Sequence, residues 1–464
     1  MASEWPDTPL GEVCEVNPDK RDSSWSHELV EYIDITSVGS GVTNEPPKLI
    51  PLHEAPSRAQ RLVRPGDTIV STVRPNRRSF LYLREPAANT VVSTGFAVLR
   101  AKKGLQPRFL FYLVSDQAFT DYLVSHEKGS AYPAVNANVF SVAEVSLPPL
   151  AEQRAIAAVL GALDDRIELN RKSARVLEGI ARSVFTSWFV DFDPVRYNIK
   201  REGEERAYER MGRAARFGSF GEDISIIDKD GRSRPLRSED IHRHVAHLFP
   251  NRFVDSPIGE VPDGWRVTRI QEVCDLGRGS SPRPIHDYMG GTVPWIKIAD
   301  ATSAGGRFIY ETKEFVTERG ATKSVWVNPG DLILSNSATC GVPIFVGLRG
   351  CIHDGWLHFR DLRGISRGYL FHLLATISEH LVHIADGSVQ KNLNTALVGD
   401  QMLTIPPSRI LAAFDLLNDS IFGKVDKTIQ QSRNLAALRD ALLPKLIAGE
   451  LRIADAEKIV GRTV

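Results

Sequence analysis

The 464-residue chain contains little cysteine and no long apolar run. Its four cysteines, at positions 14, 274, 340 and 351, form no C-x-x-C pair, which indicates reduced thiols rather than a disulfide framework. No stretch of about 18 apolar residues occurs, so we expect no membrane span. The first residues lack the basic and then apolar pattern of a signal peptide. These absences together predict a cytoplasmic protein.

The chain also lacks an excess of charge of either sign. Lys and Arg number 57, and Asp and Glu also number 57, so the formal net charge is zero. Charged residues are 25% and hydrophobic residues 42%, which is typical of a folded soluble protein. This balance does not indicate nucleic-acid binding, which is often basic, but a local basic face can coexist with acidic faces elsewhere.

Sequence motifs of catalysis are absent as well. The three Pro-Pro pairs lack the flanking Asp or Asn and the aromatic residue of a DNA amino-methyltransferase loop. No glycine-rich G-x-G-x-x-G turn follows a strand, and no phosphate-binding P-loop occurs. The 12 histidines show no metal-ligand spacing. We therefore predict no catalytic residue and no metal site in this chain.

What is present is a duplication. The segment VRPGDTIV at 63–70 is similar to VNPGDLIL at 327–334. The segment GSAYPAVNANV at 129–139 is similar to GSVQKNLNTAL at 387–397. Cys14 and Cys274 occupy matching positions, and we interpret them as small core hydrophobes. The copies lie 258 to 264 residues apart, and small drifts in that offset are typical of loop insertions. The sequence therefore predicts two heads of like fold.

Each copy is followed by a long helical pattern. In the first, steps of four and three residues produce a heptad seam that is apolar except at Asn170. Asn170 either fixes the register of a coiled coil or lies beside the seam in solvent. The seam is formed by Ile156, Leu160, Leu163, Ile167, Asn170, Ala174, Leu177, Ala181, Val184 and Trp188.

These patterns predict six segments. We expect a first target-recognition domain at 1–150, a long helix at 151–190 and a connector at 191–254. We then expect a second such domain at 255–407, a second long helix at 408–450 and a polar tail at 451–464. The heads are rich in short strands with helical segments at 109–124 and 368–384, so the fold class is mixed α/β.

Several segments resemble the specificity (S) subunit of type I restriction–modification systems. They are LPPLAEQRAI at 147–156, LDDRIELN at 163–170, SWFVDFDP at 187–194, GEVPDGW at 259–265 and LLPKLIAGE at 442–450. The resemblance covers nearly the whole chain. It departs from the family where the second helix opens with IPPSRIL at 405–411 in place of P-P-x-x-E-Q.

The resemblance implies a non-catalytic DNA-recognition subunit. In that family two target-recognition domains each read half of a split site in double-stranded DNA, and two long antiparallel helices, with pseudo-twofold symmetry, dock methyltransferase (M) subunits. S-adenosylmethionine is then expected in the M subunit and no cofactor in this chain. A restriction/translocase (R) subunit is left open as a further partner. The alternative is a coiled-coil scaffold that binds protein partners only.

Candidate DNA-contacting residues are polar and aromatic loop residues. Arg can read guanine and Asn adenine, whereas Lys and Ser more often contact phosphates. Asn136 and Asn394 match across the repeat and are alternatively shared capping residues. The candidates are Arg74, Asn76, Arg77, Arg78, Tyr132, Asn136 and Asn138 in the first head, and Arg278, Ser280, Arg283, Asn336, Lys391, Asn392 and Asn394 in the second.

Trp188 and Phe189 are the candidate partner-docking residues. They are large apolar residues at the end of the first long helix, next to a polar connector. Such residues often anchor interfaces. Alternatively, they close the helix pair.

Overall fold

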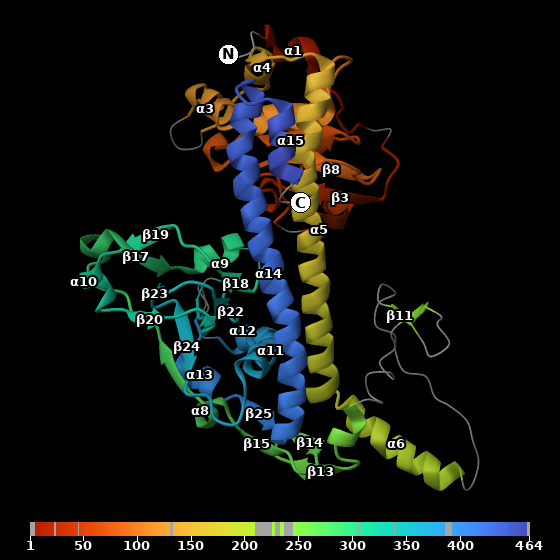
Figure 1. Ribbon diagram of the computed structural model, residues 1–464, viewed down its shortest axis with the longest axis vertical. Coiled ribbons are helices and arrows are strands. Elements are labelled where there is room, and N and C mark those ends of the chain that lie inside the picture. Colours follow the sequence, from red (N-terminus) through yellow and green to blue (C-terminus); the bar gives the residue numbers. More distant parts are fainter. Residues whose placement is uncertain are drawn as a thin grey trace. The chain divides into compact units, whose positions relative to one another are not determined.

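The computed structural model describes residues 5–22, 25–44, 46–129, 133–208, 225–227, 233–235, 245–304, 306–337, 339–385 and 392–461. The chain divides into two compact units (Figure 1). Unit 1 comprises residues 1–172 and 428–464, and unit 2 comprises residues 173–427. Each unit therefore contains one head and one half of each long helix.

The head of unit 1 is built on two four-stranded sheets. The first has the order β2 (Cys14–Val16), β9 (Phe96–Ala101), β6 (Asp67–Ser71), β7 (Phe80–Leu83). The second has the order β4 (Lys48–Pro51), β3 (Leu29–Ile33), β8 (Thr90–Ser93), β5 (Ala59–Leu62). Only the β3–β8 pair among these is parallel. Strands β6 and β8 are buried along their whole length, including the polar residues Asp67, Thr68 and Ser71 of β6.

The head of unit 2 repeats this topology. Its first sheet has the order β16 (Asp275–Arg278), β24 (Trp356–Arg360), β21 (Leu332–Ser335), β22 (Pro343–Val346), β18 (Phe308–Ile309). Its second has the order β19 (Glu314–Val316), β17 (Met289–Ile296), β23 (Gly350–Ile352), β20 (Val325–Val327), with β17–β23 parallel. Strand by strand, these orders match those of unit 1, with β18 as one addition. The predicted duplication is therefore a duplication of fold.

Short helices follow the same correspondence. Unit 1 contains α1 (Leu10–Val13), α2 (Pro107–Ser115), α3 (Gln117–Ser125) and α4 (Ala137–Ser141). Unit 2 contains α8 (Ile270–Val273), α11 (Arg367–Thr376), α12 (Ser378–Ile384) and α13 (Thr395–Gly399), with α9 (Ile298–Ala304) and α10 (Glu318–Ala321) between α8 and α11. The helical periodicity at 109–124 thus belongs to two helices, because Asp116 adopts extended backbone between them.

Peripheral strand pairs complete the heads. In unit 1, β1 (Asp7–Pro9) pairs with β10 (Glu144–Ser146), and in unit 2, β15 (Arg266–Arg269) pairs with β25 (Met402–Ile405). The hairpin of β13 (Phe253–Ser256) and β14 (Gly259–Pro262) leads into the second head. In the segment between α6 and the second head, β11 (Ser225–Ile227) pairs antiparallel with β12 (Ser233–Pro235).

The long helices are α5 (Leu150–Phe189) and α14 (Ser408–Ile447), each of 40 residues. Within unit 1 they are antiparallel neighbours, because Asp164 of α5 pairs with Arg439 and Asn170 pairs with Gln431. The seam of α5 is buried except at Leu177, which is half-buried. Asn170 is 6% exposed, and its Nδ2 donates to Oε1 of Gln431 at 3.2 Å. The buried-seam interpretation of Asn170 is therefore confirmed, and the solvent alternative is wrong.

Charged side chains attach the first head to its helices. The hydroxyl of Tyr112 donates to Oδ2 of Asp164 at 2.5 Å, and Arg439 lies 2.8 Å from Oδ1 of the same carboxylate. Arg108 pairs with Asp165 at 2.7 Å. Burial, together with the charge of Asp164, raises the pKa of Tyr112, so its hydroxyl stays a donor. Asp164 thus links three chain segments through α5.

Aromatic side chains attach the second head to the long helices in unit 2. The rings of Phe185 on α5 and Phe414 on α14 pack against each other and against Tyr369 and His372 of α11. His372 Nε2 lies 2.9 Å from Oδ1 of Asn418, inside this cluster. Burial lowers the pKa of His372 to about 4. The second head is therefore held by ring packing around a neutral histidine.

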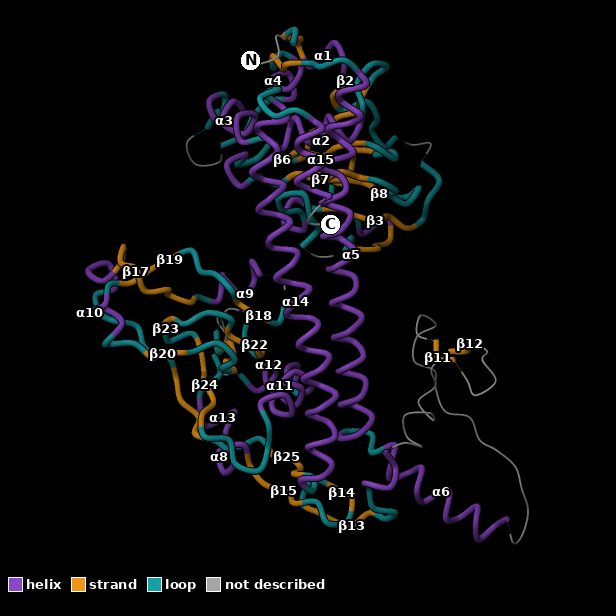
Figure 2. Tube along the Cα trace, in the orientation of Figure 1, coloured by secondary structure: helices purple, strands orange, loops and turns teal. Residues whose placement is uncertain are grey.

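The connector and the tail are more ordered than the sequence suggests. Within 191–254 the chain forms α6 (Asp193–Tyr208), whose Val195 is fully buried. Asn198 there donates to the carbonyl oxygens of Ala246 and Phe249. The polar tail is wrong as a description, because α15 (Ile453–Gly461) packs into the core of unit 1 (Figure 2). Alternating polar residues concealed its short apolar face.

The cysteines behave as core residues. Cys14 and Cys274 are each 2% exposed, which confirms their interpretation as small hydrophobes, and all four cysteines are free and buried. Burial raises the pKa of the Cys14 thiol to about 12. None of the helices in the described ranges is both long and apolar enough to cross a membrane.

Acid should destabilise unit 2 through His372. Its pKa is about 4 in the folded chain, against about 6.5 when unfolded, so its stabilising effect is complete above pH 6.5 and is lost as the pH falls toward 4. We expect His372→Gln to remove up to about 2 kcal/mol of the stability loss between pH 6.5 and pH 5. Thermal melts across this range measure it. His380→Gln, an exposed site on α12, is the control, and equal pH slopes for all three proteins would contradict the prediction.

Candidate nucleic-acid interface

Two loop segments predicted to contact DNA meet in the first head. The segment after β6 contains Arg74, whose backbone N–H donates to the carbonyl oxygen of Pro133 at 2.9 Å. Two residues earlier, the carbonyl oxygen of Thr72 accepts a hydrogen bond from the N–H of Val135 at 2.8 Å. The loop of residues 74–78 and the loop of residues 133–138 therefore lie side by side, as a common DNA-contacting surface requires.

The individual residues of this surface differ in their exposure to solvent. Asn76, Arg77 and Asn138 are exposed, and Arg74 is half-buried with left-handed backbone at φ 48°. Tyr132 lies outside the described residues. DNA contact by these residues stays a prediction.

Arg78 also has a structural role. Its guanidinium donates to the carbonyl oxygen of Ser115 at 2.7 Å and to the side-chain oxygen of Gln117, and it lies over the ring of Phe80. These contacts attach the loop after β6 to the junction of α2 and α3. Two nitrogens of Arg78 are thus hydrogen-bonded within the head, and base contact by this residue stays a prediction.

Asn136 and Asn394 are helix caps. Oδ1 of Asn136 accepts from the backbone N–H of Asn138 at the start of α4. Oδ1 of Asn394 accepts from the N–H of Leu397 at the start of α13 at 2.8 Å. The capping alternative is therefore confirmed, and it explains why these two residues match across the repeat.

In the second head, three predicted residues converge on Asp354. Arg278 donates to its carbonyl oxygen at 2.7 Å, and Asn336 donates to the same oxygen at 2.9 Å. Arg283 lies 3.3 Å from its carboxylate, which also accepts from Ser281 at 2.7 Å. Burial opposes the shift, but the hydrogen bond from Ser281 and nearby positive charge keep the pKa of Asp354 below its usual value. Asp354 thus organises a basic loop cluster.

Asn336 is a fold residue rather than a reader of DNA. It is fully buried, its N–H donates to Gly355, and its carbonyl oxygen accepts from Leu393 at 2.7 Å. Thr72 makes the equivalent bonds in the first head, to Gly95 and from Val135. The DNA-contact prediction for Asn336 is therefore contradicted, because its side chain is fully buried and donates to Asp354, while its backbone bridges two loops beneath the surface.

The remaining predicted residues of the second head divide in two groups. Ser280 is half-buried and donates to the carbonyl oxygen of Lys323 at 3.0 Å, whereas Asn392 is exposed. Lys391 lies outside the described residues. Ser280 and Asn392 stay candidates.

Trp188 and Phe189 do not form a docking surface. They are 2% and 5% exposed, and both rings pack against Phe414. Trp188 also contacts Phe249 of the connector, and Phe189 contacts Trp265. Side chains buried within one chain cannot anchor another, so the docking prediction is contradicted. The alternative, that they close the helix pair, describes their packing.

Gln153, from the P-P-x-x-E-Q motif, was not singled out by sequence although it is 1% exposed and makes three hydrogen bonds. Its Nε2 donates to the carbonyl oxygens of Gly104 and Pro148, and its Oε1 accepts from the N–H of Gln106 at 2.8 Å. It therefore clamps the loop before α2 to the first turn of α5. Its place at the end of the P-P-x-x-E-Q motif, four residues after Pro149, was the signal that could have identified it.

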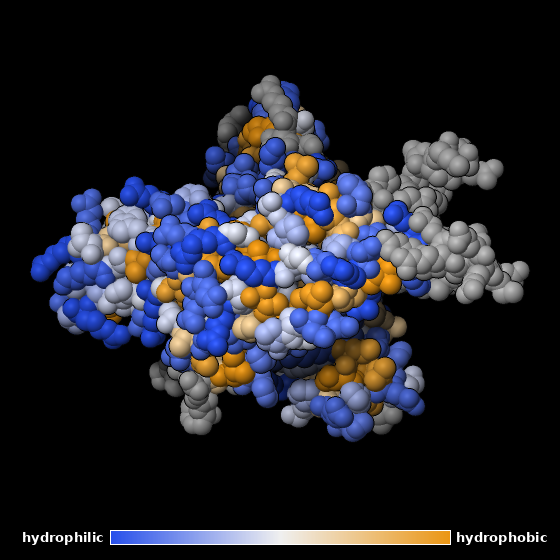
Figure 3. Space-filling model, turned by 90° about the horizontal axis from the view of Figure 1, so that it is seen from below, coloured by the Kyte–Doolittle hydropathy of each residue, from blue (hydrophilic) through white to orange (hydrophobic). Residues whose placement is uncertain are grey.

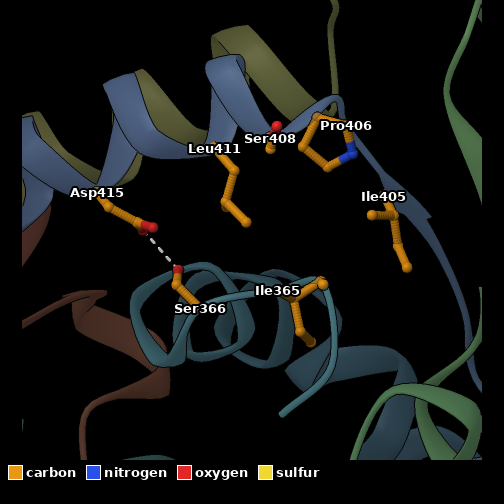
Figure 4. A pocket seen from close by; sticks show the side chains of 8 residues that line it. Ile365, Ser366, Ile405, Pro406, Ser408, Leu411 and Asp415 are labelled. Carbon is orange, nitrogen blue, oxygen red and sulfur yellow. Dashed lines mark hydrogen bonds between the residues drawn. The ribbon is translucent and has the colours of Figure 1, made fainter.

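The second copy lacks this clamp. Leu411 occupies the position of Gln153, since the N–H groups of both residues lie near the second proline of the Pro-Pro pair. A cavity of about 400 Å³ opens there between α14 and the loop of residues 364–366 (Figure 4). Leu411 points into it, and the hydrogen bond from Ser366 to Asp415 lies at one side. Where the second copy departs from the P-P-x-x-E-Q motif, it therefore also lacks the packed contact that Gln153 makes in the first copy.

Comparison with known proteins identifies the family. The family model described as "Type I restriction modification DNA specificity domain" matches residues 2–178 and 262–435. The chain belongs to the family of type I restriction–modification specificity (S) subunits. The two matched ranges correspond to the two heads with their adjoining helices. The duplication seen in the sequence is therefore a repeat of this family domain.

Individual S subunits agree with this assignment. The chain is 25% identical to the HindI specificity subunit of Haemophilus influenzae over 97% of this chain and 100% of that protein. It is 24% identical to the MjaIX specificity subunit of Methanocaldococcus jannaschii over 78% of this chain and 73% of that protein. The crystal structure of the M. genitalium S subunit shares the fold, with a TM-score of 0.50, 12% identity and 96% of each chain covered.

As an S subunit the chain is a DNA-recognition subunit and not an enzyme. Among the residues that the structure describes, no group of three or more His, Cys, Asp or Glu side chains could hold a metal ion. The predicted fold class, with duplicated α/β heads and two long antiparallel helices, is confirmed.

Reciprocal exchange of the clamp residues should have opposite effects. Gln153→Leu removes the side-chain partner of three backbone groups, of which the carbonyl group of Pro148 is buried, and should lower the free energy of unfolding by about 2–3 kcal/mol. Leu411→Gln enters an open cavity and should change stability by less than about 1 kcal/mol. Chemical denaturation of both variants measures this. Equal losses in both would show that the cavity is not the counterpart of the Gln153 site.

Proposed function

We propose that each head of this S subunit reads one half of a bipartite site in double-stranded DNA. The observation that carries the proposal is the loop surface described above, which occurs at the same place in both heads. The shared residues of this surface, such as the caps at 136 and 394, are structural. The residues left exposed differ between the copies, so the two half-sites should differ in sequence.

We further propose that M subunits dock on the outer faces of the long helices. Large apolar side chains are exposed there, with Leu416 of α14 at 78%, Leu169 of α5 at 53% and Val176 of α5 at 49%. A partner that covers these side chains removes their apolar surface from water. S-adenosylmethionine belongs in this proposal to the M subunit, and the complex acts in the cytoplasm, with an R subunit as an additional partner.

Exchange of one head tests the reading of half-sites. Replacing residues 1–146 with the matching head of a related S subunit should change one half-site only, because residues 257–404 are untouched. Methylation-site sequencing after co-expression with the M subunit measures both half-sites. A swap that altered both would contradict separate reading.

A helix insertion is the complementary control. About four extra residues near Lys172 lengthen α5 by roughly 6 Å. If the helices set the spacing, the half-sites should stay the same while their separation grows by a base pair or two, at about 3.4 Å each. A change of base identity at constant spacing would refute this role.

Docking is tested by Leu416→Asp in the full chain. The side chain is largely exposed, so the charge should weaken co-purification with the M subunit at least several-fold and leave the melting temperature nearly unchanged. Ala412→Asp is the matched control, since this residue is exposed on the same helix but small. Unchanged co-purification of the Leu416 variant would place the docking surface elsewhere.

A further inference from the structure

The edge strand β20 of the second head is bordered by four cationic side chains. They are Arg319, Lys323, Arg349 and Arg360, and we name them the cationic rim. All four are exposed, and none forms an ion pair with a carboxylate among the residues that the structure describes. Most other arginines in the head, such as Arg269 and Arg363, are paired with Asp. The rim therefore carries uncompensated positive charge.

Aromatic rings hold these cations in place. Nζ of Lys323 donates to the hydroxyl of Tyr288 at 2.6 Å and lies 4.8 Å from the centre of its ring. The guanidinium of Arg319 lies 5.9 Å from the same ring. Tyr288 is 6% exposed, so it is a fixed support. Cations positioned by a buried ring lose less side-chain entropy when they bind an anion than free ones do.

The other end of β20 has a similar arrangement. The guanidinium of Arg349 lies 4.7 Å from the ring centre of Trp326. Arg360 donates to the carbonyl oxygen of Trp326 at 2.8 Å. Lys323 lies in the turn that precedes β20, and Trp326 lies within the strand. The rim therefore combines cations in the turn before β20 with cations beside the strand itself.

The two heads differ at this edge. In unit 1 the equivalent strand β5 is covered, because the N–H of Arg21 donates to Gln60 and the N–H of Leu62 donates to Asp19. In unit 2 no backbone segment in the described ranges pairs with the outer edge of β20. Its backbone N–H groups therefore remain available to an acceptor. The end of this head that holds α10, β17 and β19 presents mostly hydrophilic side chains, at the left in Figure 3.

We propose that the cationic rim of β20 binds the phosphodiester backbone of DNA next to the half-site read by the second head. The hydrogen bond from Ser280 to the carbonyl oxygen of Lys323 places the rim beside the loop cluster around Asp354. Phosphate contacts position a protein and carry no sequence information. The rim thus supplies affinity and orientation, while neighbouring loops supply specificity. This inference rests on the proposed DNA-reading function.

Salt-dependent DNA binding by the assembled complex with M subunits tests the inference. Fluorescence anisotropy with a duplex containing the methylated site and with an unrelated duplex gives the slope of log K against log salt. Arg319→Ala with Lys323→Ala should reduce this slope by about 2 and weaken both duplexes by the same factor. Arg252→Ala with Arg269→Ala removes equal charge from arginines paired with Asp263 and Asp400, and should leave the slope unchanged.

The outcomes separate the inference from the proposed function. If the wild-type complex shows no salt-dependent binding, the proposed function fails. If it binds and the rim variant keeps the wild-type slope, the rim does not contact DNA. Self-association of the variant at an unchanged slope would mean that the cations only protect an open sheet edge from pairing, which also overturns the inference. The charge-preserving pair Arg319→Lys and Lys323→Arg should retain the wild-type slope and fold.

Discussion

The packing of α5 against α14 is the contact on which both units depend. Unit 1 is assembled from residues 1–172 and 428–464, because the first half of α5 pairs with the second half of α14. In unit 2 the end of α5 packs against the start of α14. In unit 1 one continuous hydrophobic core includes residues of α2, α5, α14 and α15. A head therefore cannot complete its core until the distant helix has docked. This makes the antiparallel helix pair a requirement for folding as well as a structural connection.

The two heads satisfy the same topology with different chemistry at the helix junction. In unit 1, Tyr112, Asp164 and Arg439 form a charged network, and Gln153 seals the start of α5. In unit 2, aromatic rings surround His372, and the start of α14 borders a cavity. Duplication preserved the strand order because the hydrogen-bonded sheets constrain it. The junctions diverged because packing tolerates any combination that fills space and pairs its polar groups.

The candidate DNA surface also combines residues whose structural role is the same in both heads with exposed residues that differ between them. Thr72 and Asn336 make equivalent backbone bridges, and Asn136 and Asn394 make equivalent caps. These residues form the frame. Arg77 and Arg283, which differ in position and partners, lie on the frame and are exposed. A fold that separates supporting residues from exposed ones can change its DNA target without losing stability.

The sequence by itself determined the features that depend on local order. The heptad steps predicted α5 to within one residue at each end, and the repeated PGD turns predicted matching strands. The segments typical of S subunits identified the family, and the polar seam position at Asn170 indicated a register contact. Each of these signals lies within a few residues of the chain, and so it can be read without knowing what packs against it.

Only the tertiary structure decided what each candidate side chain does. Asn336 looks like a DNA contact in the sequence, yet its side chain is fully buried and donates to a residue 18 positions away, and the guanidinium of Arg78 donates to a carbonyl group 37 positions away. Trp188 and Phe189 look exposed at a helix end, yet the second head buries them. The cations of the rim come from three separate chain segments that the fold brings together beside β20. A side chain's function depends on which distant groups surround it, and that information exists only after the chain has folded.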